Sequence, residues 1–421
     1  MSFPATLLRT RRKYRSDGGA ALLSEAITNA FESDPVRKLV RRTILDRASI
    51  VDQAQLRETA VREWECAPEE SPVASSTEVP IPRKRRLPHS GSFEGLESDL
   101  PTSPFVTELE DVTVLGPSGL AITPDSGLVK DTVAPDSASS GRIEKILGRS
   151  LRQNGFRRTR DIVRSPTSYS NEQYSLATTL VPLWNNYYHW TLECLPKLLG
   201  IETYRRETGN TPTVLLPPNP SSWMLESLEL VANAEIDTEP LRPGAIRVDR
   251  FVAPSYPTPS RRECFWVRDR VHDAVDVETS DSEAYPSRIY VSRRNATVRR
   301  VENEPAVLEA LSEFDIEPFE LETLSVSEQA RLFANAEFVV SPHGAGLANI
   351  VYADDPTVLE LFGQKEKTTF SRLSKLLNNE YHALFCDHTR KDIVVDTDEL
   401  VSVITEILAG NREPVVPGNE Q

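Results

Sequence analysis

The sequence predicts an α/β fold, with a parallel sheet wound by right-handed crossover helices. Between residues 288 and 408, short apolar strands alternate with amphipathic helices, which is the pattern of parallel βαβ units. One of these strands, around Phe338–Val340, runs into a turn rich in Pro and Gly, Ser341–Gly346. A chain of 421 residues with 39% hydrophobic residues can bury the cores of two such domains.

We expect an N-terminal α/β domain over residues 105–280. Gly-rich turns between short apolar runs indicate that it opens with a β-meander. Strands are expected at 112–115, 120–122, 128–129, 179–184, 213–216 and 250–253. Helices are expected from residue 187, where Asn185 or Asn186 can cap the first turn, and at 224–230.

The second α/β domain is expected over residues 281–410, followed by a polar tail at 411–421. Its strands are expected at 288–294, 316–321, 337–340, 357–362 and 381–385. Its helices are expected at 304–314, 325–333, 370–377 and 398–408. The helix from 325 has the Ser-x-x-Glu spacing of a capping box.

Two segments precede these domains. Residues 1–65 are expected to form a basic helical extension, and residues 66–104 a linker rich in Pro and Ser. The first 50 residues hold ten Arg and Lys against five Asp and Glu. A basic amphipathic segment can lie on an anionic membrane, so residues 1–50 are a candidate for peripheral contact with the inner membrane face. A solvated helix with incidental arginines is the alternative.

The composition restricts partners and location. The formal net charge is −15, and only 10 of the 48 basic residues are Lys. Such an acidic, lysine-poor surface suggests a salt-adapted, haloarchaeal protein, and it argues against nucleic-acid binding. The sequence contains no long apolar run and does not begin with a signal peptide, so we expect a cytoplasmic protein. The four Cys are widely spaced, which predicts free thiols.

His189 and Glu193 are four residues apart, so they share one face of the helix expected from residue 187. Three interpretations stay open. The pair can be a structural contact, or a metal site whose third ligand no HxxxH or HExxH motif supplies. It can also be a general base with its orienting partner. The position just after a strand end, where α/β proteins bind ligands, favours the third interpretation.

A candidate anion site lies in the second domain. Ser292, Arg293 and Arg294 follow one strand, the His343–Gly346 turn follows another, and Glu360 ends a third. Guanidinium groups form bidentate bonds to phosphate, and glycines let a ligand approach backbone N–H groups. Surface ion pairs are the alternative for the two arginines. The chain has no GxxxxGK[ST] motif, which excludes a P-loop site.

In their order along the chain, these motifs resemble those of glycosyltransferase family 61, over roughly residues 105–410. The residues that carry the resemblance are Ile289–Arg294, Arg300, Val301, Asn303, Glu304, Ser327–Gln329, Leu332, Phe333, Ala336 and Pro342–Asn349, and upstream Asn186, Tyr188–Trp190, Glu193, Leu195 and Pro196.

The resemblance implies a GT-B architecture, with two Rossmann-like domains facing each other across a cleft. It also implies transfer from a nucleoside-diphosphate sugar to a glycan acceptor with inversion, without a metal cofactor. His189 or Glu193 would be the base. The residues expected to bind the substrates are Asn186, Ser292, Arg293, Arg294, His343, Gly344, Ala345, Gly346, Asn349 and Glu360.

The chain is more similar to prokaryotic members that make capsular or cell-surface polysaccharide, because no membrane anchor is evident. Two alternatives stay open at this point. One is a polysaccharide pyruvyltransferase-like enzyme, and the other is a non-catalytic subunit of glycan assembly.

Overall fold

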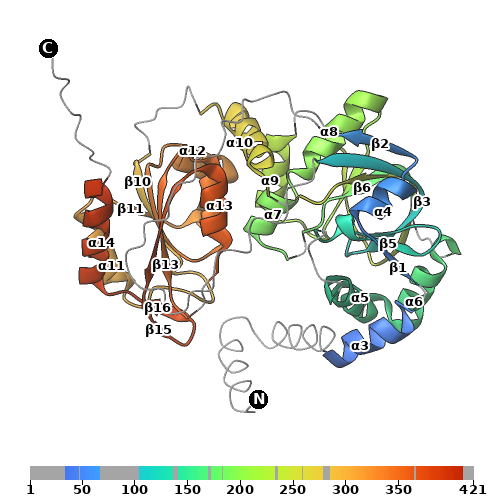
Figure 1. The fold of residues 1–421 in the computed structure, drawn as a ribbon, viewed down its shortest axis with the longest axis horizontal. Helices are drawn as coiled ribbons and strands as arrows, with labels where there is room; N and C mark the ends of the chain where they lie inside the picture. The colour runs from blue at the N-terminus through green and yellow to red at the C-terminus, as the bar shows by residue number, and fades with distance from the viewer. Residues whose placement is uncertain are drawn as a thin grey trace.

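The computed structural model describes residues 34–46, 48–66, 104–135, 141–168, 172–182, 184–232, 236–257, 259–277, 285–364 and 367–410. Two β-sheets lie on opposite sides of a central layer of helices (Figure 1). The central layer contains α7, α9 and α10 beside the first sheet and α12 and α13 beside the second. The chain is therefore α/β, as the alternating sequence pattern predicts.

The first sheet has nine strands in the order β1-β5-β4-β3-β9-β6-β7-β8, with β2 paired to β3. Its strands are β1 (Ser49–Val51), β2 (Arg62–Glu65), β3 (Phe105–Gly116), β4 (Leu120–Ile122), β5 (Gly127–Val129), β6 (Glu172–Thr179), β7 (Thr213–Leu216), β8 (Thr238–Pro240) and β9 (Gly244–Pro254). The predicted meander is the antiparallel run β3-β4-β5. The strands β9, β6, β7 and β8 are mutually parallel.

Residues 34–66 differ from the extension that we expected over residues 1–65. The strand β1 pairs with β5, and β2 pairs with β3, so both belong to the first sheet. Apolar burial explains their position, because Leu56 and Cys66 lie in the cores of this sheet. The Cys66 N–H donates to Pro104 O (2.7 Å), which joins the two ends of the expected linker. The rest of the linker, 67–103, and the first 33 residues lie outside the described residues.

The strand expected at 179–184 is wrong in its boundaries. The strand β6 occupies Glu172–Thr179 and ends where we expected it to begin. Its first four residues alternate between half-buried and exposed, and only its last four are buried. The first residues of this strand are polar and only partly buried, so they do not form an apolar run. A prediction that relies on apolar runs therefore misses the start of the strand.

The second sheet is entirely parallel, in the order β11-β10-β12-β13-β14. Its strands are β10 (Arg288–Val291), β11 (Glu317–Phe319), β12 (Phe338–Pro342), β13 (Thr357–Phe362) and β14 (Glu380–Phe385). The helices α11 (Glu304–Ser312) and α14 (Thr397–Gly410) cover its outer face, and α12 (Val326–Ala334) and α13 (Thr369–Leu377) lie on its inner face (Figure 1). The predicted order of elements is confirmed here.

One apolar core joins the helices that face each other between the sheets. On the first side these are α7 (Tyr187–Glu193), α8 (Lys197–Thr208), α9 (Ser222–Val231) and α10 (Arg261–Val275). Their buried residues share a cluster with residues of α12, α13 and the 3-10 helix η6 (Ala345–Tyr352). Two hydrogen bonds stabilise this contact. The backbone N–H groups of Val326 and Ser327, at the start of α12, donate to Oε2 and Oε1 of Glu226 on α9 (2.9 Å each). Among the described helices, none is long and apolar enough to cross a lipid bilayer.

The start of α10 yields a pH-dependent prediction. Glu263 and Ser260 form a capping box, and burial raises the pKa of Glu263 from its usual 4.5 to about 7. The folded state therefore holds this proton more tightly than the unfolded chain, so the group lowers the free energy of unfolding as the pH rises from 4.5 to 7. Glu263→Gln keeps the cap without the charge. We expect the variant to be more stable than the wild type at pH 8 by up to about 3 kcal/mol.

The measurement is denaturant unfolding of both proteins at pH 8 and at pH 4.5. At the lower pH the two free energies of unfolding should differ by less than about 1 kcal/mol, because Glu263 is then protonated in the folded state and about half protonated in the unfolded chain. A difference that does not change with pH would contradict the buried-acid explanation.

Candidate active site

The candidate residues follow the carboxyl ends of parallel strands in both sheets. In a parallel sheet ordered like the second one, ligands bind beyond the carboxyl ends of the two neighbouring strands whose connections leave in opposite directions. Those strands are β10 and β12. Arg293 follows β10, and His343 follows β12. In the first sheet β6 and β9 are parallel neighbours. His189 follows β6, and Tyr256 follows β9.

The first cluster contains His189, Glu193 and Tyr256. Asn186 caps α7 by accepting from the His189 N–H (3.1 Å), which sets the first turn of the helix. One turn later, Glu193 Oε2 lies 2.7 Å from His189 Nδ1. The same oxygen accepts from the Tyr256 hydroxyl (2.6 Å). Both members of the predicted pair are thus in direct contact, and Tyr256 adds a partner that the sequence did not indicate.

This arrangement determines which nitrogen of His189 can react. A carboxylate at Nδ1 favours the tautomer that carries its proton there, so Nε2 keeps its lone pair. Burial and the neighbouring Glu193 charge raise the pKa of Tyr256 well above its usual value, so the phenol stays a donor to Glu193. The His189 side chain keeps 16% exposure. His189 can therefore accept a proton at Nε2 from a bound molecule.

A buried lysine supports this cluster from behind. Lys197 is almost completely buried, and its Nζ donates to Asp131 O (2.9 Å). The ammonium also lies 4.5 Å from the centroid of the Tyr256 ring. Asp131 Oδ2 accepts from the Tyr256 N–H (2.9 Å), so the position of Tyr256 is determined at both its backbone and its ring.

The second cluster repeats the same chemistry on the other sheet. His343 Nδ1 lies 2.5 Å from Glu360 Oε1, and the Tyr381 hydroxyl donates to Glu360 Oε2 (2.6 Å). Glu360 has no exposed surface. Burial is also the main reason why the pKa of Tyr381 is raised, followed by the charge of Glu360. Glu360 therefore holds His343 in place, and the expectation that Glu360 also binds the substrates stays a prediction.

A chain of aromatic rings connects the two histidines. The His189 ring lies 5.3 Å from that of Tyr188, which lies 5.8 Å from that of Phe370. The Phe370 ring in turn lies 5.5 Å from His343. Each step is within the usual range of contacting rings. The two clusters thus face the same aromatic layer from opposite sides, and Trp184, 39% exposed, lies 4.8 Å from His189.

Arg293 lies directly on the glycine turn. A Cβ atom added to Gly344 would be 2.0 Å from Arg293 NH1, so only glycine leaves room for this guanidinium. The NH2 group donates to Val298 O (3.3 Å), while Nε is buried without a partner. The predicted proximity of Arg293 and the Gly turn is present in the structure. The turn continues into the 3-10 helix η6.

A second guanidinium, that of Arg299, accompanies Arg293. Burial, and next the charge of Arg299, lowers the pKa of Arg293 to about 10. The pKa of Arg299 is also lowered by burial, and Glu360 opposes this effect. Neither arginine forms an ion pair with another described residue, and Nε of Arg299 is also buried without a partner. Glu322 and Glu360 offset part of this charge from a distance, and two neighbouring cations without a direct ion pair still favour a bound anion.

Comparison with known protein families agrees with this chemistry. Residues 187–359 match the family model of Glycosyltransferase 61, and the match includes both histidines and the arginine pair. This part of the chain is therefore similar to a glycosyltransferase 61 domain. No curated protein matches the chain. The domain implies transferase activity with a sugar donor and an acceptor.

Several residues that the sequence placed in the glycosyltransferase 61 site have structural partners. Arg294 is 62% exposed and forms an ion pair with Glu320, the alternative left open for it. Ser292 is buried and donates to Glu304 (2.8 Å). Asn349 is fully buried, where its Oδ1 accepts from the Tyr187 hydroxyl (2.7 Å). These contacts hold Ser292 and Asn349 in place. Because both side chains are buried and already hydrogen-bonded, few of their polar atoms can reach a ligand.

The two small residues of the turn have different roles. A Cβ atom at Gly346 would lie 3.0 Å from Leu321 and 3.3 Å from Val291, so Gly346 permits tight packing beneath the turn. Ala345 begins η6 and is half-buried. Asn186 acts as the cap of α7, which positions His189.

The residues that sequence analysis missed are Tyr256, Tyr381 and Arg299. Tyr256 lies 63 residues from its partner Glu193, and no local spacing indicates that contact. Arg299 could have been suspected from the sequence, because it lies six residues after Arg293 in the same loop. Among the described residues, no group of three His, Cys, Asp or Glu side chains is close enough to hold a metal ion.

The close contact between Gly344 and Arg293 yields a second prediction. Gly344→Ala should push the guanidinium out of its position while leaving the fold intact, because the side chain can move. Loss of one charge-assisted contact should weaken the binding of inorganic pyrophosphate about tenfold or more. Calorimetric titration measures the affinity. Gly410→Ala, where the added atom meets open space, is the matched control, and equal affinities in both variants would exclude Arg293 from the anion site.

Proposed function

We propose that the chain transfers a sugar from a nucleoside-diphosphate sugar to a glycan acceptor in cell-surface polysaccharide or glycoprotein synthesis, with inversion at the anomeric carbon. The observation that carries the proposal is the His189–Glu193 pair, with Nε2 of His189 available, together with the arginine pair beside His343. A base and an anion site are the two components that such a transfer requires.

In this mechanism the donor diphosphate binds Arg293, Arg299 and the Gly344 turn. The acceptor hydroxyl attacks the anomeric carbon and gives its proton to His189 Nε2, while the bond from that carbon to the phosphate oxygen breaks. Glu193, held by Tyr256, stabilises the imidazolium that forms. The two guanidinium groups stabilise the charge that grows on the leaving diphosphate, each by on the order of 3 kcal/mol or about a hundredfold in rate.

We also propose a GT-B-like arrangement, with the donor on the second sheet and the acceptor beside the first. The support is that His189 and Arg293 come from different sheets, that each follows the carboxyl end of a parallel strand, and that Arg293 lies at the topological switch point of the second sheet. We propose that no metal cofactor takes part, since the arginines supply the positive charge that a divalent ion would otherwise provide. Glycan acceptors carry apolar sugar faces, for which the exposed Trp184 beside His189 is a suitable contact.

The third prediction tests the donor and the role of the arginine pair. One nucleoside diphosphate among UDP, GDP, TDP and ADP should raise the melting temperature, and EDTA should leave this shift unchanged. Arg299→Gln should abolish the shift. Arg294→Gln is the matched control, because Arg294 is exposed and paired with Glu320, and it should keep the full shift. Loss of the shift in EDTA would contradict a metal-independent site, and no shift with any nucleotide would contradict the donor class.

The fourth prediction concerns the base. His189→Gln should reduce kcat of sugar transfer by on the order of a hundredfold or more, while the nucleotide-induced melting shift persists. Tyr256→Phe removes one hydrogen bond to Glu193 and should reduce kcat less, by about tenfold. The measurement is steady-state transfer with the donor identified in the melting experiment. A fully active His189→Gln enzyme would refute the assignment of the base.

A further inference from the structure

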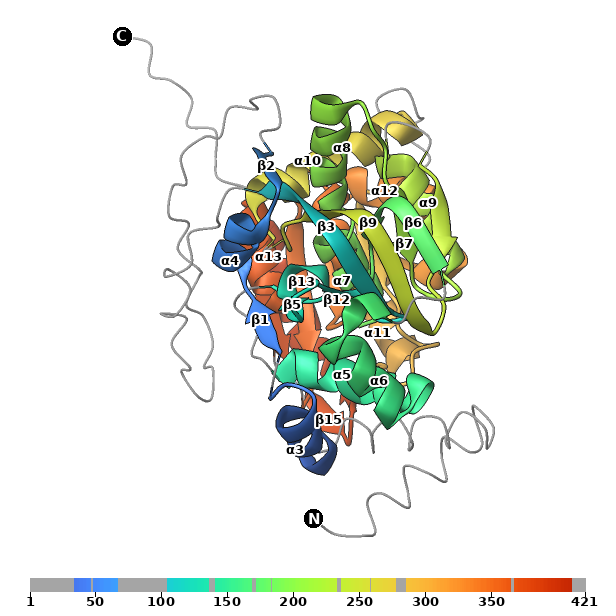
Figure 2. The ribbon, with the colours of Figure 1, turned by 90° about the vertical axis from the view of Figure 1, so that its right-hand side faces the viewer.

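The three helices α3 (Asp34–Thr43), α5 (Gly141–Asn154) and α6 (Phe156–Arg164) form a strongly basic group in an acidic chain, called here the basic helix cluster. Residues 34–46 and 141–164 contain twelve Arg and Lys and four Asp and Glu, a formal net charge of +8. The whole chain carries −15. Figures 1 and 2 show the three helices side by side at one end of the molecule, beyond the first sheet.

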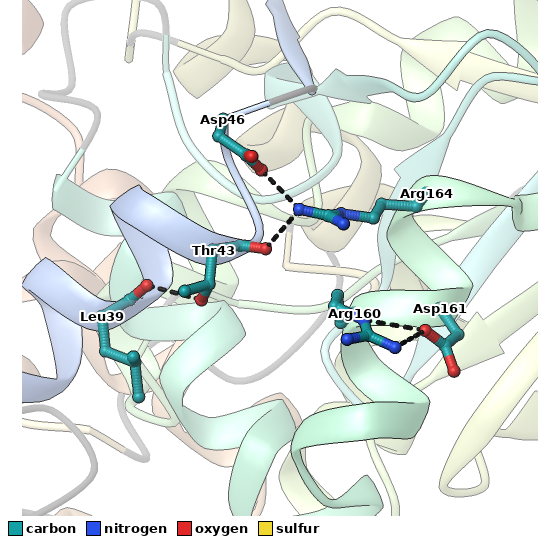
Figure 3. A network of polar contacts seen from close by, with 6 residues as sticks. All are labelled: Leu39, Thr43, Asp46, Arg160, Asp161 and Arg164. Atoms are coloured by element: carbon teal, nitrogen blue, oxygen red, sulfur yellow. Dashed lines mark hydrogen bonds and ion pairs between the residues drawn. The ribbon is translucent and has the colours of Figure 1, made fainter.

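Polar contacts join α3 to the other two helices. Arg164 on α6 donates to Thr43 O (2.9 Å) and to Asp46 Oδ1 (2.8 Å), and the Thr43 hydroxyl donates to Leu39 O (2.6 Å) within α3 (Figure 3). Arg41 on α3 forms an ion pair with Glu144 on α5. A shared apolar core with residues from all three helices lies beneath them. The basic side chains are therefore carried by one rigid body.

The basic side chains exceed the acids that could neutralise them. Asp46, Glu144 and Asp161 are each engaged by an arginine of the cluster. Four further basic residues are exposed and form no ion pair with another described residue. They are Lys38, Arg42, Arg157 and Arg158. Their charges are available to an external partner.

Two large apolar side chains are exposed among these charges. Leu39 on α3 is 45% exposed, and Phe156 at the start of α6 is 37% exposed. Only five large apolar side chains are exposed in the described part of the chain, and two of them lie in the basic helix cluster. Basic residues interspersed with exposed Leu and Phe are typical of surfaces that lie in a membrane interface.

We propose that the basic helix cluster binds the surface of an anionic phospholipid membrane. Lys38, Arg42, Arg157 and Arg158 would contact lipid phosphates, and Leu39 and Phe156 would enter the interface. None of these six residues belongs to the candidate active site, so the proposal does not depend on the proposed function. The cluster borders that site through Arg142 on α5, whose guanidinium lies 4.7 Å from the centroid of the Trp184 ring. The proposal extends the expectation for residues 1–50, from which Lys38, Leu39 and Arg42 come, to Phe156, Arg157 and Arg158 on α6. Nucleic acid explains the charge less well, since it offers no apolar interior to Leu39 and Phe156.

The test is co-sedimentation of the full chain with vesicles of phosphatidylcholine, alone or mixed with phosphatidylglycerol, over a salt series in which the protein stays folded. The wild type should bind only the anionic vesicles, and binding should fall as the salt concentration rises. The quadruple variant Lys38→Gln, Arg42→Gln, Arg157→Gln and Arg158→Gln should bind at least about a hundredfold more weakly, since each surface charge contributes about fivefold.

A charge-matched control changes four exposed basic residues on other elements, Arg206, Lys375, Arg390 and Lys391, to Gln. It should bind like the wild type. A double variant, Leu39→Gln and Phe156→Gln, keeps the charge and should bind more weakly. Equal melting temperatures verify that each variant is folded. The proposal is overturned if the wild type does not bind, if both quadruple variants lose affinity equally, or if the double variant binds normally while duplex DNA competes with the vesicles.

Discussion

The packing of α7 against the 3-10 helix η6 is the contact on which the candidate site depends. Trp190 and Leu192 on one side share a core with Leu347 and Ile350 on the other. The Tyr187 hydroxyl donates to Asn349 across this contact (2.7 Å). Because α7 follows β6 and η6 follows β12, this packing brings the carboxyl ends of parallel strands from two separate sheets together. Neither sheet alone holds both the base and the anion site of the proposed mechanism.

A His–Glu–Tyr cluster occurs on each side of this contact, as His189–Glu193–Tyr256 and as His343–Glu360–Tyr381. The two clusters differ in how deeply they are buried. The Glu360 side chain has no exposed surface and its His343 partner only 8%, while the Glu193 and His189 side chains keep 12% and 16%. The more buried cluster lies beside Arg293 and Arg299 and holds the glycine turn in position. The more exposed cluster has a ring nitrogen available for proton transfer. In the proposed mechanism, identical side chains thus position the turn on one sheet and accept a proton on the other.

Local signals in the sequence predicted the local structure well. A cap at Asn185 or Asn186 and a shared helix face for His189 and Glu193 follow from local spacing, and so does the succession of strands and helices along the second domain. Long-range contacts were not predictable in this way. Arg293 and Arg294 are indistinguishable as residue types, and only the position of Glu320, 26 residues away, decides which of them is neutralised.

The arginine pair shows why the choice between neighbouring cations matters physically. A buried guanidinium without an acidic partner raises the free energy of the folded state, and a second one beside it adds repulsion. Arg293 and Arg299 carry both costs, since burial lowers the pKa of each and Arg299 lowers that of Arg293 further, while Glu322 and Glu360 offset part of them. An anion bound beside the two guanidinium groups would reduce both costs. The binding of a diphosphate at this position would therefore gain free energy from its contacts and from the relief of a repulsion built into the folded chain.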